Sequence, residues 1–258
     1  MPLFNSGSVA VVTGAGPGMG RAIALGFADE GVDVVLAARR RERLEPIADE
    51  IRERGREALV VVADLADGDS CRDVVTTTIQ RFGRLDHLVQ NGHHPGDWAR
   101  VADADPDAWR HIFDVNFFGA LHLVQAAVAV MEPGTSIVLV NSGAALRNPP
   151  TMGAYAASKA ALASLVRTAA VEFGPTIRVN GVFLGPVTGE SMDQGAAATA
   201  AATGVTVEEF FRQRAQDLPI RHIPTPEECA GAVLFFASSL AAPVTGQHLS
   251  VNGGQWLT

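Results

Sequence analysis

The sequence is poor in cysteine, in charge and in long apolar runs, and each shortage excludes a class of protein. Only Cys71 and Cys229 occur among 258 residues, with no CxxC pair, so we expect neither a disulfide framework nor a metal site. No apolar stretch approaches the roughly 20 residues of a membrane span. The first residues lack the basic and apolar regions of a secretory signal. We therefore expect a soluble, cytoplasmic protein with no membrane partner.

Basic residues are also scarce, because 20 Lys and Arg stand against 28 Asp and Glu, for a net charge of −8. Nucleic acids and anionic lipids are bound by clustered Lys and Arg, so we expect neither as a partner. The one basic run, Arg39–Arg41, is local. With 47% hydrophobic and 19% charged residues, the chain has enough apolar surface to bury a large core.

Short β-rich runs alternate with longer helical patterns along the whole chain. This alternation is typical of βαβ units and a parallel sheet, and the continuous apolar strands suit a sheet with helices on both faces. No linker or charge block divides the chain, so residues 1–258 are predicted to form one doubly wound α/β domain. Seven strands are predicted, at Val9–Val12, Val32–Ala37, Ala58–Val62, Leu85–Val89, Ser136–Val140, Ile177–Val182 and His248–Val251.

One connection is unusually long. From Thr188 to about Pro219 the chain passes an Ala/Thr-rich patch at residues 195–202 and an amphipathic helix around Val207–Ala215. A connection of this length is either a surface insertion or a functional lid. Because it follows the C-terminal end of a strand, where open α/β sheets bind their ligands, we favour a lid over residues 188–219.

The loop Thr13–Gly20 lies between the first strand and a helix that begins near Arg21. Gly14 permits a tight turn, Gly18 lets backbone amides approach a pyrophosphate, and Gly20 lets the helix pack close to the strand. A glycine-rich loop alone is equally well a flexible turn. The order strand, loop, helix favours dinucleotide binding, with Pro17 and Met19 also in contact.

Tyr155, the only tyrosine of the chain, stands four residues before Lys159. Residues four apart share one face of a helix, so the two side chains are predicted to point the same way. A phenol has an ordinary pKa of about 10, and a nearby ammonium lowers it by stabilising the phenolate. The alternative is a chance pair on a surface helix.

The glycine spacing resembles that of the short-chain dehydrogenase/reductase family, and the resemblance extends from Val9 to Gly254. Ser142 precedes Tyr155 by thirteen residues, as the family's catalytic serine does, and Asn116 matches its active-site asparagine. The resemblance implies a Rossmann-type oxidoreductase that transfers a hydride between nicotinamide and an alcohol or ketone carbon.

The same resemblance implies a role for each of four catalytic residues. Tyr155 exchanges a proton with the substrate oxygen, and Ser142 donates a hydrogen bond to that oxygen. Lys159 lowers the pKa of Tyr155 and holds the nicotinamide ribose. Asn116 anchors a water that links Lys159 to solvent.

The end of the second strand indicates which dinucleotide is preferred. Ala38 stands where an acidic residue would bind the ribose 2′-OH of NAD, and Arg39 and Arg40 follow it. NADP(H) is therefore favoured, with NAD(H) possible, because Pro17 occupies a position where NADP-preferring relatives often carry a basic residue. The resemblance adds further cofactor contacts at Asp64, Leu65, Asn91, Gly92, Gly185, Val187, Thr188, Tyr155 and Lys159. For Asp64 a helix N-cap is the alternative role.

The chain departs from the family pattern at two places. His93 replaces a glycine and must adopt or avoid that glycine's backbone geometry. With His94 and Trp98 nearby, a metal site is conceivable, but we favour an ordinary substrate-side loop because no third ligand is suggested. Gly189 stands where a threonine is usual, and Thr188 lies one residue early.

The substrate pocket is predicted to be mainly apolar, which suggests an apolar alcohol or ketone. Its predicted lining is Ala144, Leu146 and Met152, and its predicted cap is Met192 with the lid-helix residues Phe210 and Phe211, although the last two serve equally well as core. The apolar helix Tyr155–Phe173 and the segment Val251–Gly254 suggest a homotetramer.

Two rival functions are weaker. An enoyl reductase of this fold usually separates its tyrosine and lysine by six residues. A catalytically silent dinucleotide sensor is expected to have lost one of Ser142, Tyr155 and Lys159, all of which are present.

Overall fold

The structure is a computed structural model that describes residues 2–257, except for the side chain of residue 191. Its seven strands confirm the predicted sheet, with boundaries within a few residues of those expected. They are β1 (Val9–Thr13), β2 (Asp33–Ala38), β3 (Ala58–Val62), β4 (His87–Gln90), β5 (Thr135–Ser142), β6 (Ile177–Leu184) and β7 (His248–Val251).

All seven strands are parallel, in the order β3-β2-β1-β4-β5-β6-β7. The chain winds outward from β1 in one direction through β3, and then starts again on the other side of β1 at β4. The helices that follow β1 and β4, α1 (Met19–Asp29) and α5 (Gly119–Val128), pack on opposite faces of the sheet at this switch point, and doubly wound sheets bind ligands there, beyond the carboxyl ends of the strands.

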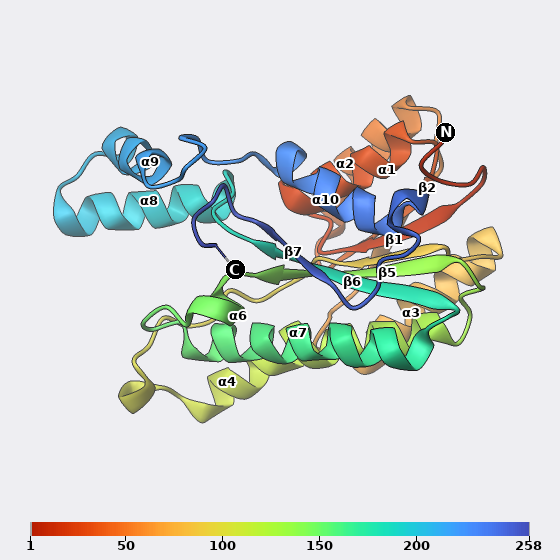
Figure 1. Ribbon diagram of the computed structural model, residues 1–258, viewed down its shortest axis with the longest axis horizontal. Coiled ribbons are helices and arrows are strands. Elements are labelled where there is room, and N and C mark those ends of the chain that lie inside the picture. Colours follow the sequence, from red (N-terminus) through yellow and green to blue (C-terminus); the bar gives the residue numbers. More distant parts are fainter. Residues whose placement is uncertain (1, 258) are drawn as a thin grey trace.

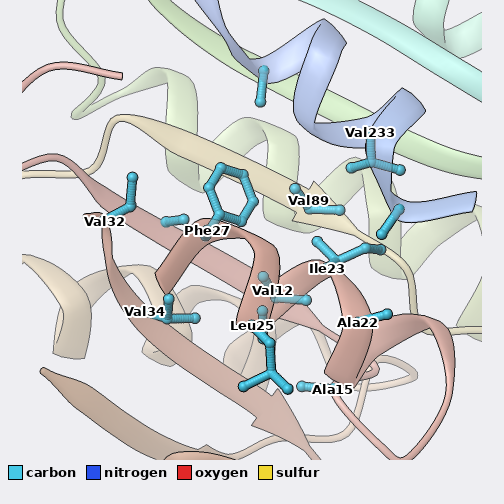
Figure 2. Close-up of a cluster of buried hydrophobic side chains, with 14 of the residues drawn as sticks. Val12, Ala15, Ala22, Ile23, Leu25, Phe27, Val32, Val34, Val89 and Val233 are labelled. Atoms are coloured by element: carbon cyan, nitrogen blue, oxygen red, sulfur yellow. The ribbon is translucent and has the colours of Figure 1, made fainter. Parts of the chain in front are cut away.

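Helices cover both faces of the sheet (Figure 1). Neighbouring strand residues point to opposite faces, so Val12 packs in the core beneath one helical layer and Val11 beneath the other. Figure 2 shows Ile23 and Phe27 of the first helix over Val12, with Val233 beside them. One layer holds α1 (Met19–Asp29), α2 (Arg41–Glu53) and α10 (Pro226–Ala237), and the other holds α3 (Gly68–Phe82), α5 (Gly119–Val128) and α7 (Gly153–Phe173).

Smaller helices lie at the ligand-binding end of the sheet. They are α4 (Pro106–Phe113), which packs on α7, the short α6 (Ala144–Arg147), and the 3-10 turn Val101–Asp103. A second 3-10 turn, Ser239–Ala241, lies at the opposite end, where Arg178 near the start of β6 donates to the Ala241 carbonyl at 3.2 Å. Within the described part of the chain, no helix combines the length and the apolar character required to cross a membrane.

The long connection contains two helices, α8 (Glu190–Thr203) and α9 (Val207–Gln216), which protrude beyond the sheet (Figure 1). The sequence predicted α9 but described residues 195–202 only as an Ala/Thr-rich patch, so α8 is a correction. Alanine has the highest helix propensity of all residues, yet an alanine run has no amphipathic period to reveal it.

Candidate active site

The loops that follow β1 and β4 touch at the switch point. Gly14 has φ +63°, and a Cβ there would lie 2.4 Å from the Cα of Gly92. The side-chain amide of Asn91 donates to the Gly14 carbonyl at 2.9 Å. Glycine is therefore needed at residue 14 both for its backbone conformation and for the close contact.

The glycine loop delivers the N-terminus of α1 to the switch point. No side chain caps this helix, and its first turn has no acidic residue. Gly18 has φ +102°, and a Cβ on Gly20 would lie 2.3 Å from the Gly14 carbonyl oxygen. The uncapped backbone amides and the positive end of the helix dipole suit the binding of a pyrophosphate. The N-terminus of α1 therefore fits the pyrophosphate of a dinucleotide.

A cleft of about 480 Å³ begins at this helix end and reaches Tyr155 and Lys159. A smaller cavity of about 160 Å³ adjoins it at Gly14, Gly92 and His93. Every residue predicted to bind the cofactor lines one of the two. The larger is lined by Gly14, Pro17, Gly18, Met19, Gly20, Asn91, Gly92, Tyr155, Lys159, Gly185, Val187 and Thr188, and the smaller by Arg39, Arg40, Asp64 and Leu65. Their contact with a cofactor remains a prediction.

Asp64 is not the N-cap of α3. That position belongs to Asp67, whose carboxylate accepts from the amides of Asp69 and Ser70. Asp64 instead accepts from the amide of Ala66 at 3.0 Å. The capping alternative considered for Asp64 is therefore wrong, and its carboxylate lines the smaller cavity.

The three reactive side chains lie on one part of the cleft wall. Ser142 ends β5, and Tyr155 and Lys159 occupy the first turns of α7. The Lys159 ammonium donates to the Val140 carbonyl at 3.1 Å and lies 5.8 Å from the centre of the Tyr155 ring. Lys159 is only 2% exposed, and this burial lowers its pKa to about 7.

The predicted lowering of the Tyr155 pKa by Lys159 is not what the structure gives. Burial raises the pKa of the Tyr155 phenol, because desolvation disfavours the phenolate, and a hydrogen bond with Ser142 opposes the rise. Desolvation also disfavours the Lys159 ammonium, so only part of the Lys159 population is positively charged at neutral pH. Of these two neighbours, Ser142 and not Lys159 therefore favours the phenolate of Tyr155.

Asn116 is fully buried in a π-helical turn, Asp114–Phe118, a kind of distortion that is frequent at functional sites. Its Oδ1 accepts from the His94 amide at 2.7 Å, and its Nδ2 donates to the His94 carbonyl and to Ser158 Oγ, both at 3.0 Å. The side chain thus braces the loop after β4 against α7 and does not line the cleft. Its role in holding a water stays a prediction.

Asn141 is a supporting residue that the sequence analysis missed. Its Oδ1 accepts from the Ser142 amide at 2.8 Å, and its Nδ2 donates to the Lys159 carbonyl at 3.0 Å. This buried amide joins the end of β5 to the first turns of α7. An asparagine at the end of an otherwise apolar strand was the available signal.

His93 lies at the junction of the two cavities, and its ring centre is 6.2 Å from that of Tyr155. It does not adopt the left-handed geometry of a glycine, since the non-glycine residues with positive φ in residues 2–257 are Asn148, Thr151 and Arg221. The cleft leaves the imidazole accessible, yet desolvation by the surrounding walls and the Lys159 charge lower the pKa of His93 to about 4. His93 is therefore neutral at pH 7.

No three His, Cys, Asp or Glu side chains among the described residues are grouped so that they could hold a metal ion. The rings of His94 and His111 are 5.2 Å apart, without a third ligand.

The substrate side differs from the apolar pocket that was predicted. A cavity of about 430 Å³ meets the cleft at Ser142 and includes Ala144 and Met152, and Met192 lines the cleft itself. Leu146, Phe210 and Phe211 line neither. The prediction that these three residues face the substrate pocket is therefore wrong. Leu146 on α6 is exposed to solvent, and the two phenylalanines of α9 pack on each other with ring centres 5.7 Å apart.

The fold and the site together define a Rossmann-type protein with a dinucleotide-binding loop and a Ser–Tyr–Lys set. A family model described as "Enoyl-(Acyl carrier protein) reductase" matches residues 14–255. The chain belongs to the short-chain dehydrogenase/reductase family, as its motifs predicted.

Relatives with several substrates share this fold. The chain is 33% identical over 261 residues to 7alpha-hydroxysteroid dehydrogenase of Escherichia coli, with 98% of each chain covered. L-sorbose reductase from Gluconobacter frateurii, complexed with NADPH and L-sorbose, has a TM-score of 0.94 at 30% identity and covers 100% of both chains. NAD+-bound xylitol dehydrogenase has a TM-score of 0.88 at 30% identity, covering 96% of this chain and 99% of the other.

Proposed function

We propose that this protein is an NAD(P)-dependent oxidoreductase that interconverts an alcohol and a carbonyl compound. The observation that carries the proposal is that Ser142, Tyr155 and Lys159 line the same cleft as the uncapped N-terminus of α1. A bound nicotinamide would accept a hydride from the alcohol carbon or supply one to the carbonyl carbon. The steroid, sorbose and xylitol enzymes among the relatives support this reaction class.

The chain's own residues handle the proton and the substrate oxygen. In oxidation the Tyr155 phenolate takes the hydroxyl proton as the carbon loses its hydride, and in reduction the phenol returns that proton. Ser142 donates to the same oxygen and stabilises the charge that develops there. Lys159 has only the Val140 carbonyl as its acceptor in the described part of the chain, so its remaining N–H groups are available to the nicotinamide ribose.

We favour NADP(H) as the cofactor. Arg39, Arg40 and Arg43 line the smaller cavity together with Ala38, and guanidinium groups bind a 2′-phosphate through forked, charge-assisted hydrogen bonds. The relatives include structures with NADPH and structures with NAD, which supports a nicotinamide dinucleotide without choosing between them.

The experiment is a screen of the purified protein with NADPH and NADH against alcohols and carbonyl compounds, followed by nicotinamide absorbance. Tyr155→Phe should lower turnover about 100- to 10,000-fold, because it removes the proton donor while keeping the ring. Undiminished turnover in this variant would contradict the mechanism. Cofactor binding without turnover of any compound would instead favour a dinucleotide sensor.

Enoyl reduction is the second candidate, favoured by the matching family model, which is described as an enoyl-(acyl carrier protein) reductase. The four-residue separation of Tyr155 and Lys159 argues against it. A 2-enoyl thioester in the same screen separates the two activities, since only an enoyl reductase consumes it.

The homotetramer and the cytoplasmic location stay predictions. Val171, Leu240 and Leu249 are exposed apolar residues that a subunit interface would cover, and a sedimentation mass of one subunit would contradict assembly. Cys71 and Cys229 are both free and buried, which suits a reducing compartment.

A further inference from the structure

The cavity of about 430 Å³ beside the cleft has a wall of positive charge. It shares Ser142, Leu184, Gly185 and Pro186 with the cleft, so it opens directly onto the reaction centre. The rest of its wall comes from three separate segments: α6 with the loop that follows it, the lid helix α9, and the end of the described chain.

Two arginines, Arg147 of α6 and Arg214 of α9, face this cavity, and no Asp or Glu among the described residues lines it. Neither guanidinium has a hydrogen-bond acceptor or an ion-pair partner within residues 2–257. Most other arginines of the protein do, although Arg39, Arg40, Arg100 and Arg167 also lack such a partner among the described residues. Arg212, two residues before Arg214 on the same helix, donates two hydrogen bonds to the Glu209 carboxylate, at 2.7 and 2.8 Å. Within residues 2–257 the cavity therefore combines two cations without an acidic counter-charge.

Trp256 also lines this wall. Its indole packs against Gly143. A Cβ at residue 143 would lie 2.1 Å from the ring, so only a glycine fits there beside the indole. The Arg147 guanidinium lies 5.9 Å from the centre of the indole, within the range of a cation–π contact. The Trp256 Nε1 is buried and has no partner among the described residues, so a buried donor is left unsatisfied.

We propose that the substrate carries a carboxylate, which binds Arg147 and Arg214 while its alcohol or carbonyl carbon lies at Ser142 and Tyr155. The substrate class is then a hydroxy acid and the corresponding oxo acid. This inference rests on the proposed oxidoreductase function. Planar guanidinium forks match the geometry of a carboxylate, and an anion also relieves the repulsion between the two arginines. The carboxylate itself is unchanged by the reaction.

A comparison of oxo acids with their methyl esters tests the proposal. The esters keep the carbonyl group and lose the charge, so the wild-type protein should prefer the acids in kcat/KM. Arg147→Gln and Arg214→Gln should each lower kcat/KM for the acids roughly 10- to 100-fold, mainly through KM, and leave the esters unchanged. Arg212→Gln, on the same helix but outside the cavity, is the matched control and should change neither.

Two outcomes of this comparison overturn the proposal. One is equal use of acids and esters by the wild-type protein. The other is an equal loss for acids and esters in the two arginine variants, which would show a structural role. Use of phosphate or sulfate esters in preference to carboxylates would also overturn the assignment of a carboxylate.

Binding measured without turnover separates this inference from the proposed function. Benzoate should bind more tightly than benzamide, its neutral analogue, to the protein saturated with NADP+ or, if that does not bind, to the protein alone. Tryptophan fluorescence and calorimetry follow the binding. The preference for benzoate should disappear in the Arg147→Gln/Arg214→Gln double variant, and persistence there would overturn the anion site. A benzoate site in a protein that turns over no alcohol or ketone would refute the oxidoreductase and leave the anion site standing.

Discussion

The cleft and the cavity beside it have walls that are held in opposite ways. In the cleft wall, α7 carries Tyr155 and Lys159 and packs Leu162 and Val166 into the core without exposure. In the predicted lid, α9, which carries Arg214 to the cavity, has no buried residue, and in α8 the buried described side chain is Ala196. The side chains that we propose to handle the proton on α7 therefore sit on a well-packed element, and Arg214, one of the two arginines that we propose to bind the substrate, sits on a weakly anchored one. This difference suggests that mutations in α7 alter chemistry and stability, while mutations in the lid alter affinity.

The largest effect is expected for Lys159→Met. The variant should lose turnover on the order of 100-fold or more, since it removes the preorganised donor that we propose to hold the nicotinamide ribose beside Tyr155. It should also become more stable at low pH. The pKa of Lys159 is about 7 in the folded protein and has its ordinary value of 10.5 in the unfolded chain, so the burial of its charge destabilises the fold fully below pH 7 and not above pH 10.5.

Thermal unfolding at two pH values checks this linkage. Lys159→Met should exceed the wild type in unfolding free energy by roughly 2 to 4 kcal/mol at pH 6, and the gain should shrink towards pH 10. A gain that is the same at both pH values would show that the charge of Lys159 is not its cause.

A matched pair of truncations tests the contrast between the helices directly. Leu162→Ala in α7 should lower the unfolding free energy by about 2 to 5 kcal/mol, because it leaves a cavity in the core. Phe210→Ala in α9 should lower it by less than about 1 kcal/mol, because its ring is only half-buried on the lid. Chemical denaturation measures both. Equal losses would remove the distinction between the rigid wall and the lid.

The adenosine end of the cleft should show an intermediate effect. Arg39→Ala should raise the KM for NADPH roughly tenfold and leave that for NADH unchanged, because it removes a charge-assisted contact with the 2′-phosphate. Arg41→Ala is the control, since Arg41 pairs with Glu45 at 2.8 Å and lines neither cavity of the cofactor site. An equal change for both cofactors would contradict the preference for NADP.

The smallest effect is expected at the contact between the lid and the body. The guanidinium of Arg43 on α2 donates two hydrogen bonds, at 3.0 and 3.2 Å, to the carboxylate of Glu190, the first residue of α8. Glu190→Gln should speed cofactor release a few-fold at low salt and lose this effect at high salt, because an exposed ion pair is screened. Stopped-flow release measures it. Glu209→Gln, which breaks a pair inside α9, should leave the release rate unchanged.

Much of the site could be predicted because its signals are local in the chain. The loop Thr13–Gly20 combines a strand, glycines and a helix within one segment, and Tyr155 and Lys159 share a helix face by spacing alone. Ser142 could be placed only through the family resemblance, yet it too lies on the strand that precedes their helix.

The parts that were missed depend on contacts between distant segments. Arg147 and Arg214 are 67 positions apart and line one cavity only because the fold brings α6 and α9 to it. Neither carries a pattern that sets it apart from the protein's other arginines. The bridging role of Asn141 likewise needs β5 and α7 to be packed together.

The sequence by itself predicted the type of fold, the seven strands, the glycine-rich loop and the pairing of Tyr155 with Lys159. Hydrophobic period, glycine conformation and helix spacing are properties of short segments, so they can be recognised without the folded structure. Only the tertiary structure decided the pKa directions of Tyr155 and Lys159 and the charge of the wall beside the cleft. Desolvation and the convergence of like charges arise from neighbours that the fold brings together, so the spacing of Tyr155 and Lys159 supports the proposed reaction and the packing around them supports the proposed substrate.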